Sequence, residues 1–99
     1  MNKVVNVAIQ FLPQNDKGSL SYALIDKAIE VIQKSGLKYK VCPFETVVEG
    51  DYETIMRLIF EMHQACYQAG AEEIISFIKI HSSKNQPVRM SEKFQKYEL

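Results

Sequence analysis

The residues best placed to do chemistry are polar side chains that interrupt two otherwise apolar strand patterns. Asn6 and Gln10 fall in the first apolar run, and Glu45, Thr46 and Glu49 fall among valines later in the chain. If these strands are neighbours, their polar atoms could converge on one small ligand with several donors and acceptors. A carboxylate pair such as Glu45 and Glu49 would favour a cationic or amino-bearing heterocycle. The alternative is that both carboxylates point into solvent at the strand ends.

Two aromatic residues could complete such a site. Tyr22 stands at the start of a predicted helix, and Phe44 stands in a predicted turn directly before Glu45. Either ring could provide a wall for stacking or for a cation–π contact with a bound heterocycle.

The other reactive residue types lack the spacing that chemistry requires. Cys42 and Cys66 form no CxxC pair, and His63 and His81 are not at metal-ligand spacing, so the sequence predicts no zinc and no cofactor. No histidine lies near Cys42 in sequence, and no acid–base pair can be named, so we expect a protein that is not an enzyme. Two unpaired cysteines indicate a reducing, cytoplasmic setting, in which they pack as small hydrophobes.

The elements that must position these residues begin with a strand at Lys3–Leu12, where apolar residues alternate. Pro13 should stop this strand, and Gln14–Gly18 should form a loop. Ser19 or Ser21 then caps a helix whose end is marked by Gly36. The buried stripe of that helix is predicted to comprise Ile25, Ala28, Ile29 and Ile32.

A hairpin and a second helix follow. Leu37–Val41 reads as an edge strand, the turn lies at Pro43, and Glu45–Glu49 is the next strand, which Gly50 ends. Asp51 should cap the second helix. The predicted buried stripe of this helix is Ile55, Ile59, Met62, Cys66 and Ala69. A second apolar stripe, which is either a widened core contact or an oligomer contact, is Met56, Phe60, His63 and Tyr67.

Glu73–His81 is the last predicted strand, apolar on both faces. The element order predicts one α+β domain over residues 1–99, with the ferredoxin-like βαββαβ arrangement and both helices on one face of a four-stranded sheet. We expect an antiparallel sheet apart from a parallel central pair, the first and third strands. The polar tail from about Ser82 should contain an extended piece at Val88–Met90 and a helical turn at Ser91–Tyr97.

The sheet face without helices would expose apolar side chains, with Ile75 and Phe77 on one side of the last strand. Two subunits packing these faces together would cover them, so we expect a homodimer, or a homotetramer if the second stripe also pairs. Twelve basic and twelve acidic residues cancel, which argues against nucleic acid as a partner. The longest apolar run is too short to span a membrane, and the sequence does not suggest a signal peptide.

Three stretches resemble the small thiamine-binding, YkoF-like family, an uncharacterised family numbered 0045. The run SGLKYKVCPFETVVEG at residues 35–50 is similar to the family signature SGxxYxxxPxxTxxEG. Gly70-Ala71, the strand end Ile78-Lys79-Ile80, and the tail Met90-Ser91-Glu92-Lys93 match further parts of the family pattern. The chain departs from it at Gln14-Asn15-Asp16, where relatives often carry a small or apolar residue.

The resemblance implies a ferredoxin-like fold that pairs through its sheets. It also implies binding of thiamine or its hydroxymethylpyrimidine moiety without catalysis, in thiamine salvage or transport. Carried onto this chain, it places Glu45 and Thr46 at the pyrimidine edge, adds a polar contact from Gln10, and packs Tyr22 on the ring. The signature itself includes Thr46 and Glu49.

Overall fold

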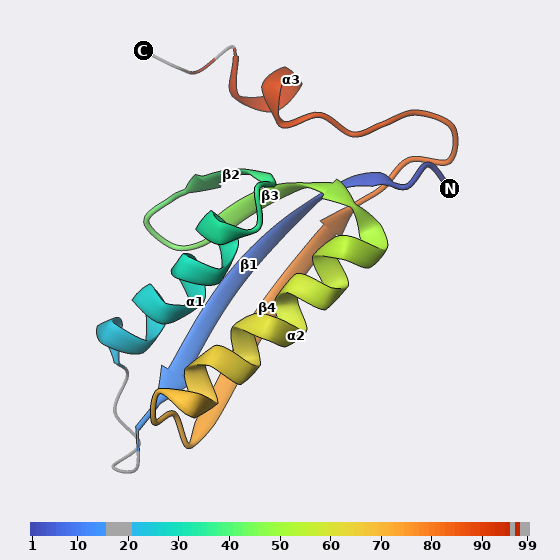
Figure 1. Cartoon of the computed structure of the whole chain (residues 1–99). Coiled ribbons are helices and arrows are strands. Elements are labelled where there is room, and N and C mark those ends of the chain that lie inside the picture. Colours follow the sequence, from blue (N-terminus) through green and yellow to red (C-terminus); the bar gives the residue numbers. More distant parts are fainter. Residues whose placement is uncertain (16–20, 96, 98–99) are drawn as a thin grey trace.

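The computed structural model describes residues 1–15, 21–95 and 97. The elements in chain order are β1 (Val4–Gln14), α1 (Tyr22–Lys34), β2 (Lys38–Val41), β3 (Thr46–Asp51), α2 (Tyr52–Gln68), β4 (Glu73–His81) and α3 (Met90–Phe94). The strands lie in the order β2-β3-β1-β4, and α1 and α2 cover one face of this sheet (Figure 1). The predicted α+β, ferredoxin-like order is therefore confirmed.

All described strand pairs in the sheet are antiparallel, so the expectation of a parallel central pair was wrong. β1 pairs with β3 antiparallel from Val4↔Asp51 to Ile9↔Thr46, and with β4 antiparallel from Asn6↔His81 to Gln14↔Glu73. The reason is the β2–β3 hairpin, which reverses the chain, so that β3 runs opposite to β1 although β2 does not.

β1 has the predicted alternation but is longer than predicted. Val5, Val7, Ile9 and Phe11 are buried beneath the helices, at 0 to 6 % exposure. Pro13 does not end the strand, because it pairs with Ile74 of β4 and the strand continues to Gln14. β3 lies beside β1 only as far as Ile9, so β1 has no strand partner on that side at Pro13. The N–H that proline lacks is therefore not needed for a hydrogen bond between strands.

The two helices bury their apolar stripes against the sheet, although each stripe is shifted from its prediction. α1 buries Leu24, Ala28 and Ile32, whereas Ile25 and Ile29 are only half-buried. α2 buries Ile55, Leu58, Met62 and Cys66, leaves Ile59 half-buried and exposes Ala69. Ala69 is exposed because it is the C-cap and not part of the helix body. α1 and α2 also pack against each other, and the Cys66 thiol of α2 donates to the Leu24 carbonyl of α1.

The predicted helix boundaries agree closely with the structure. Ser21 caps α1 by accepting a hydrogen bond from the Leu24 N–H, and Gly36 beyond its end has a φ of 77°. Asp51 caps α2 by accepting from two backbone N–H groups. The alternative cap Ser19 and most of the predicted Gln14–Gly18 loop lie outside the described residues. Gly50 does not end β3, which continues to Asp51.

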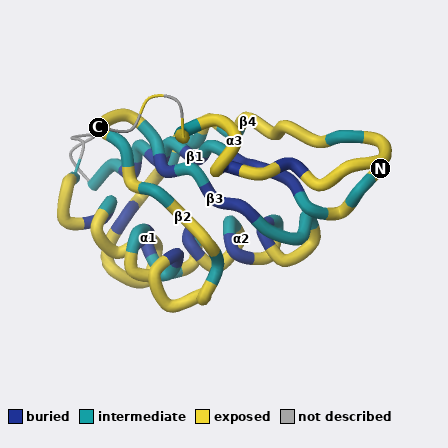
Figure 2. Tube along the Cα trace, turned by 90° about the horizontal axis from the view of Figure 1, so that it is seen from above, coloured by how far each residue is buried: buried dark blue, intermediate teal, exposed yellow. Residues whose placement is uncertain are grey.

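The segment after β4 folds back over the sheet face that lacks helices (Figure 2). Val88 and Met90 are buried there, at 7 and 2 % exposure. The Val88 N–H donates to the Val4 carbonyl, and the Lys40 ammonium of β2 lies 4.3 Å from the centre of the Phe94 ring. This C-terminal segment therefore covers the β2–β3 part of the face, while the β4 part stays open.

Candidate functional site

A cavity of about 380 Å³ lies between α1, the β2–β3 turn and the second half of β1. Its volume falls in the range of roughly 300–1,000 Å³ that small-molecule sites occupy. The walls are mainly apolar and come from α1, α2, the end of β2 and the β2–β3 turn, through Ile25, Ala28, Ile29, Ile32, Met62, Val41, Pro43 and Phe44. A small organic ligand with an apolar ring would fit the size and the lining of this cavity.

Four of the five predicted ligand residues line this cavity: Gln10, Tyr22, Glu45 and Thr46. Tyr22 and Phe44 lie at its mouth, with 75 and 82 % of their surfaces exposed. Large exposed aromatic rings beside a cavity can lose this exposure on ligand binding.

Thr46 is placed differently from Glu45 and Glu49. It pairs with Ile9, so its side chain lies on the helix-covered face and is 6 % exposed. Its hydroxyl makes no hydrogen bond to another described residue. The hydroxyl is also not among the fully buried side-chain atoms without a partner, which in the described part of the chain comprise Asn6 Oδ1. The Thr46 hydroxyl therefore keeps contact with the cavity and is available to a ligand.

Gln10 and Glu45 lie on the other face of the sheet, at the rim of the cavity. Gln10 pairs with Phe77 on this face, and a Glu45 carboxylate oxygen lies 3.3 Å from the Lys79 ammonium of β4. Lys79 is 73 % exposed, so this ion pair is accessible to solvent and adds little stability. The carboxylate of Glu45 can therefore exchange Lys79 for a cationic ligand group at small cost.

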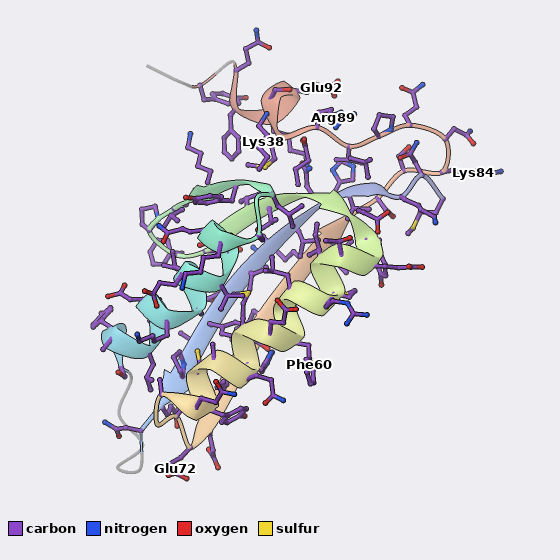
Figure 3. The ribbon with its side chains drawn as sticks, viewed as in Figure 1. Lys38, Phe60, Glu72, Lys84, Arg89 and Glu92 are labelled. Carbon is purple, nitrogen blue, oxygen red and sulfur yellow. The ribbon has the colours of Figure 1, made fainter. Side chains whose placement is uncertain are left out.

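Glu49 lies away from the cavity and binds the C-terminal segment. One carboxylate oxygen accepts the Met90 N–H at 2.6 Å, and the other lies 3.5 Å from Arg89 Nη1. Figure 3 places Arg89 in the segment that crosses above the strands. Only 9 % of Glu49 is exposed, so its charge is stabilised chiefly by these two donors. The structure thus separates Glu49 from Glu45, and the expected carboxylate pair does not form in one place.

We expect Glu49→Ala to detach the C-terminal segment and to lower the free energy of unfolding by about 2 kcal/mol. The physical reason is that the variant removes a charged acceptor and leaves the Met90 N–H without a partner. Urea denaturation measures the stability, and hydrogen exchange of the Met90 amide reports the detachment.

Glu30→Ala is the matched control for this experiment. It removes an exposed ion pair with Lys27 on α1 and should change the stability by less than about 0.5 kcal/mol. If the Met90 amide stayed protected in Glu49→Ala, the segment would be held by its buried apolar residues and not by Glu49.

Cys66 and His63 occupy structural positions. Burial raises the pKa of the Cys66 thiol, which donates to the Leu24 carbonyl at 3.3 Å, so this cysteine is a poor nucleophile. His63 packs edge-on against Phe11, and its Nδ1–H donates to the Ile59 carbonyl at 2.8 Å. His81 is exposed at the end of β4.

No group of three or more metal-ligand side chains occurs within residues 1–15, 21–95 and 97. Over the same part of the chain, no helix has the length and apolar character to cross a membrane.

Fold and cavity together define a small ferredoxin-like protein with a ligand-sized, mainly apolar pocket beside its central strand. The family model of thiamine-binding proteins matches residues 7–98, and the chain belongs to this family. A UPF0045 protein of Clostridium perfringens is 37% identical over 92 residues, which cover 93% of this chain and 95% of that protein.

Solved structures agree with this assignment. A domain of unknown function, DUF77, from Bacillus cereus superposes with a TM-score of 0.89 at 38% identity, covering 99% of this chain and 96% of that one. A Thermotoga maritima protein, proposed to act in thiamine biosynthesis or salvage, superposes with a TM-score of 0.83 at 35% identity, covering 96% and 99%.

Proposed function

We propose that this protein binds thiamine or its hydroxymethylpyrimidine moiety in the cavity beside β1, without catalysing a reaction. The observation that carries the proposal is the unpaired Thr46 hydroxyl in the wall of an otherwise apolar cavity. An apolar pocket with a few directed polar groups suits a flat heterocycle that carries an amino group. Membership of the thiamine-binding family supports the same ligand.

The two halves of thiamine match two parts of the site. The aminopyrimidine ring suits the apolar cavity, where Thr46 can hydrogen-bond to its edge and Tyr22 can pack against its face. The thiazolium cation suits the rim, where the Glu45 carboxylate and the exposed Phe44 ring lie. Hydroxymethylpyrimidine would occupy the inner part alone.

A binding role without catalysis fits the chemistry of the cavity lining. Cys42 is the one thiol among the described lining residues, and its Sγ lies 3.9 Å from the Lys40 carbonyl oxygen with no histidine among the lining residues. A protein that binds thiamine or its precursor without changing it would serve salvage or transport, and the Thermotoga maritima relative is proposed to act in thiamine biosynthesis or salvage. The free cysteines support a cytoplasmic location.

The open part of the sheet face supports a homodimer. Ile75 and Phe77 of β4 expose 48 and 54 % of their surfaces there, beside the half-buried Leu12 of β1. A second copy that packs its own sheet against this patch would remove these side chains from water. On the opposite side of the molecule, Phe60 of α2 points outward (Figure 3) and could join dimers into a tetramer.

The ligand proposal predicts a stabilisation that can be measured directly. A ligand present at 100 times its dissociation constant raises the free energy of unfolding by about 2.7 kcal/mol. We therefore expect millimolar thiamine or hydroxymethylpyrimidine to raise the melting temperature by several degrees. Isothermal titration calorimetry should show saturable binding of the same compounds.

The alternative is an oligomeric regulatory or interaction module without a small-molecule ligand. It predicts no change in melting temperature and no heat of binding with either compound at millimolar concentration. That result would exclude the thiamine proposal, whereas binding of either compound would exclude the alternative.

A further inference from the structure

β1 extends beyond β3, the strand on one side of it, and this leaves part of the β1 backbone without a strand partner on that side. The β1–β3 register ends at Ile9↔Thr46, whereas the β1–β4 register continues to Gln14↔Glu73. Over residues 10–14, β1 therefore has a described strand on one side and none on the other. The cavity lies along this second side, and Gln10, Phe11 and Leu12 line it.

Hydrogen bonds at the ends of β1 show which residues direct their backbone groups to that side. The Lys3 carbonyl accepts from Tyr52, next to β3, and the Pro13 carbonyl accepts from Ser21. The Gln14 carbonyl accepts from Glu72, next to β4. Successive residues of a strand direct their N–H and C=O groups to alternate sides. Odd-numbered residues of β1 therefore face β3, and even-numbered residues face β4.

Phe11 is the residue whose backbone groups face the open edge. Ile9, two residues earlier, pairs with Thr46 of β3. Pro13, two residues later, has no N–H, and its carbonyl already accepts from Ser21 at 3.2 Å. Between them, Phe11 directs both an N–H donor and a C=O acceptor toward the cavity side. In the described part of the chain, no strand residue pairs with Phe11 on the cavity side of β1.

The β2–β3 turn explains why this edge stays open. The Cys42 N–H donates to the Glu45 carbonyl, which closes the turn on itself directly before β3 begins. The residue that would continue β3 opposite Phe11 is Phe44, and it lies in this turn with 82 % of its surface exposed. The position that a further residue of β3 would fill is therefore part of the cavity.

We propose that the Phe11 backbone recognises the amino edge of the pyrimidine, so that the ligand takes the place of the missing residue of β3. This inference rests on the proposed ligand. Directly opposed residues in an antiparallel sheet exchange two N–H···O bonds. An aminopyrimidine offers the matching pair: its amino group donates to the Phe11 carbonyl, and the adjacent ring nitrogen accepts from the Phe11 N–H. Recognition by backbone selects this donor–acceptor order whatever side chain stands at residue 11.

The test combines amide hydrogen exchange with two ligand analogues, on the intact protein. Saturating hydroxymethylpyrimidine should slow exchange of the Phe11 amide, which has no strand partner on the cavity side in the described part of the chain, about tenfold or more. An analogue without the amino group should bind about tenfold or more weakly, because it leaves the Phe11 carbonyl unpaired. An analogue with an oxo group in place of the amino group reverses the order and should bind still more weakly.

The outcomes separate this inference from the proposed function. If hydroxymethylpyrimidine binds but the Phe11 amide exchanges unchanged and the analogue without the amino group binds equally well, the backbone inference is wrong and the ligand assignment stands. If no compound binds, both are wrong. Protection of the Phe11 amide without ligand, rising with protein concentration, would show that the edge pairs with a second copy and would overturn the inference.

Discussion

Thr46→Val should weaken the binding of hydroxymethylpyrimidine about tenfold or more while the fold is preserved. The substitution keeps the side-chain shape at a site that is 6 % exposed and removes only the hydroxyl in the cavity wall. A ligand group left unpaired in a buried site costs about 1–3 kcal/mol, and each 1.4 kcal/mol is a factor of ten in affinity. Calorimetry measures the affinity, and the melting temperature without ligand reports the fold.

Thr54→Val is the matched control for this variant. Thr54 is exposed in the first turn of α2 and does not line the cavity, so its valine variant should bind as tightly as the wild type. Equal affinity of Thr46→Val and wild type would mean that Thr46 serves packing and contributes nothing to the ligand.

If the proposed homodimer forms through the open sheet face, Phe77→Glu should dissociate it into monomers at micromolar concentration. Phe77 is 54 % exposed at the centre of the open patch, between Ile75 and Lys79 on β4. In a face-to-face dimer, the variant would bury one unpaired carboxylate from each subunit, at a cost of several kcal/mol. Analytical ultracentrifugation measures the mass, and ligand calorimetry shows whether each monomer still binds.

Phe60→Glu tests the other exposed apolar surface with the same chemical change. It lies on α2, on the side away from the sheet, and is 62 % exposed. If the sheet face forms the dimer, Phe60→Glu should still form dimers and should prevent only their association into tetramers. Monomers with Phe60→Glu together with dimers for Phe77→Glu would assign the dimer to the helix face.

Much of the fold could be predicted from local patterns because local interactions determine it. The alternation of apolar residues in β1 identifies the face that packs beneath the helices. Asp51 marks the start of α2 because its side chain caps backbone N–H groups, and Gly36 marks the end of α1 because it adopts a positive φ. The open Ile75 and Phe77 on β4 also followed from alternation once both helices were placed on one face. Each of these features depends on spacing within one element or on the order of elements.

The site was harder to predict because it depends on strand lengths and tertiary packing. Thr46 lies on the helix-covered face of the sheet, whereas Glu45 and Glu49 lie on the other face. The three polar residues that the sequence predicted to act together are therefore separated. Glu49 of β3 instead binds the C-terminal segment, through Met90 and Arg89 about 40 residues later in the chain. Pro13 was predicted to end β1, so the sequence did not predict the part of β1 that extends beyond β3 and borders the cavity.

A crystal structure of the protein with hydroxymethylpyrimidine tests the central claim most directly. The account predicts density for the pyrimidine ring inside the cavity, within hydrogen-bonding distance of the Thr46 hydroxyl and the Phe11 backbone, with Tyr22 packed against the ring. Density only on the open sheet face near Phe77, or beneath the C-terminal segment near Glu49, would contradict it.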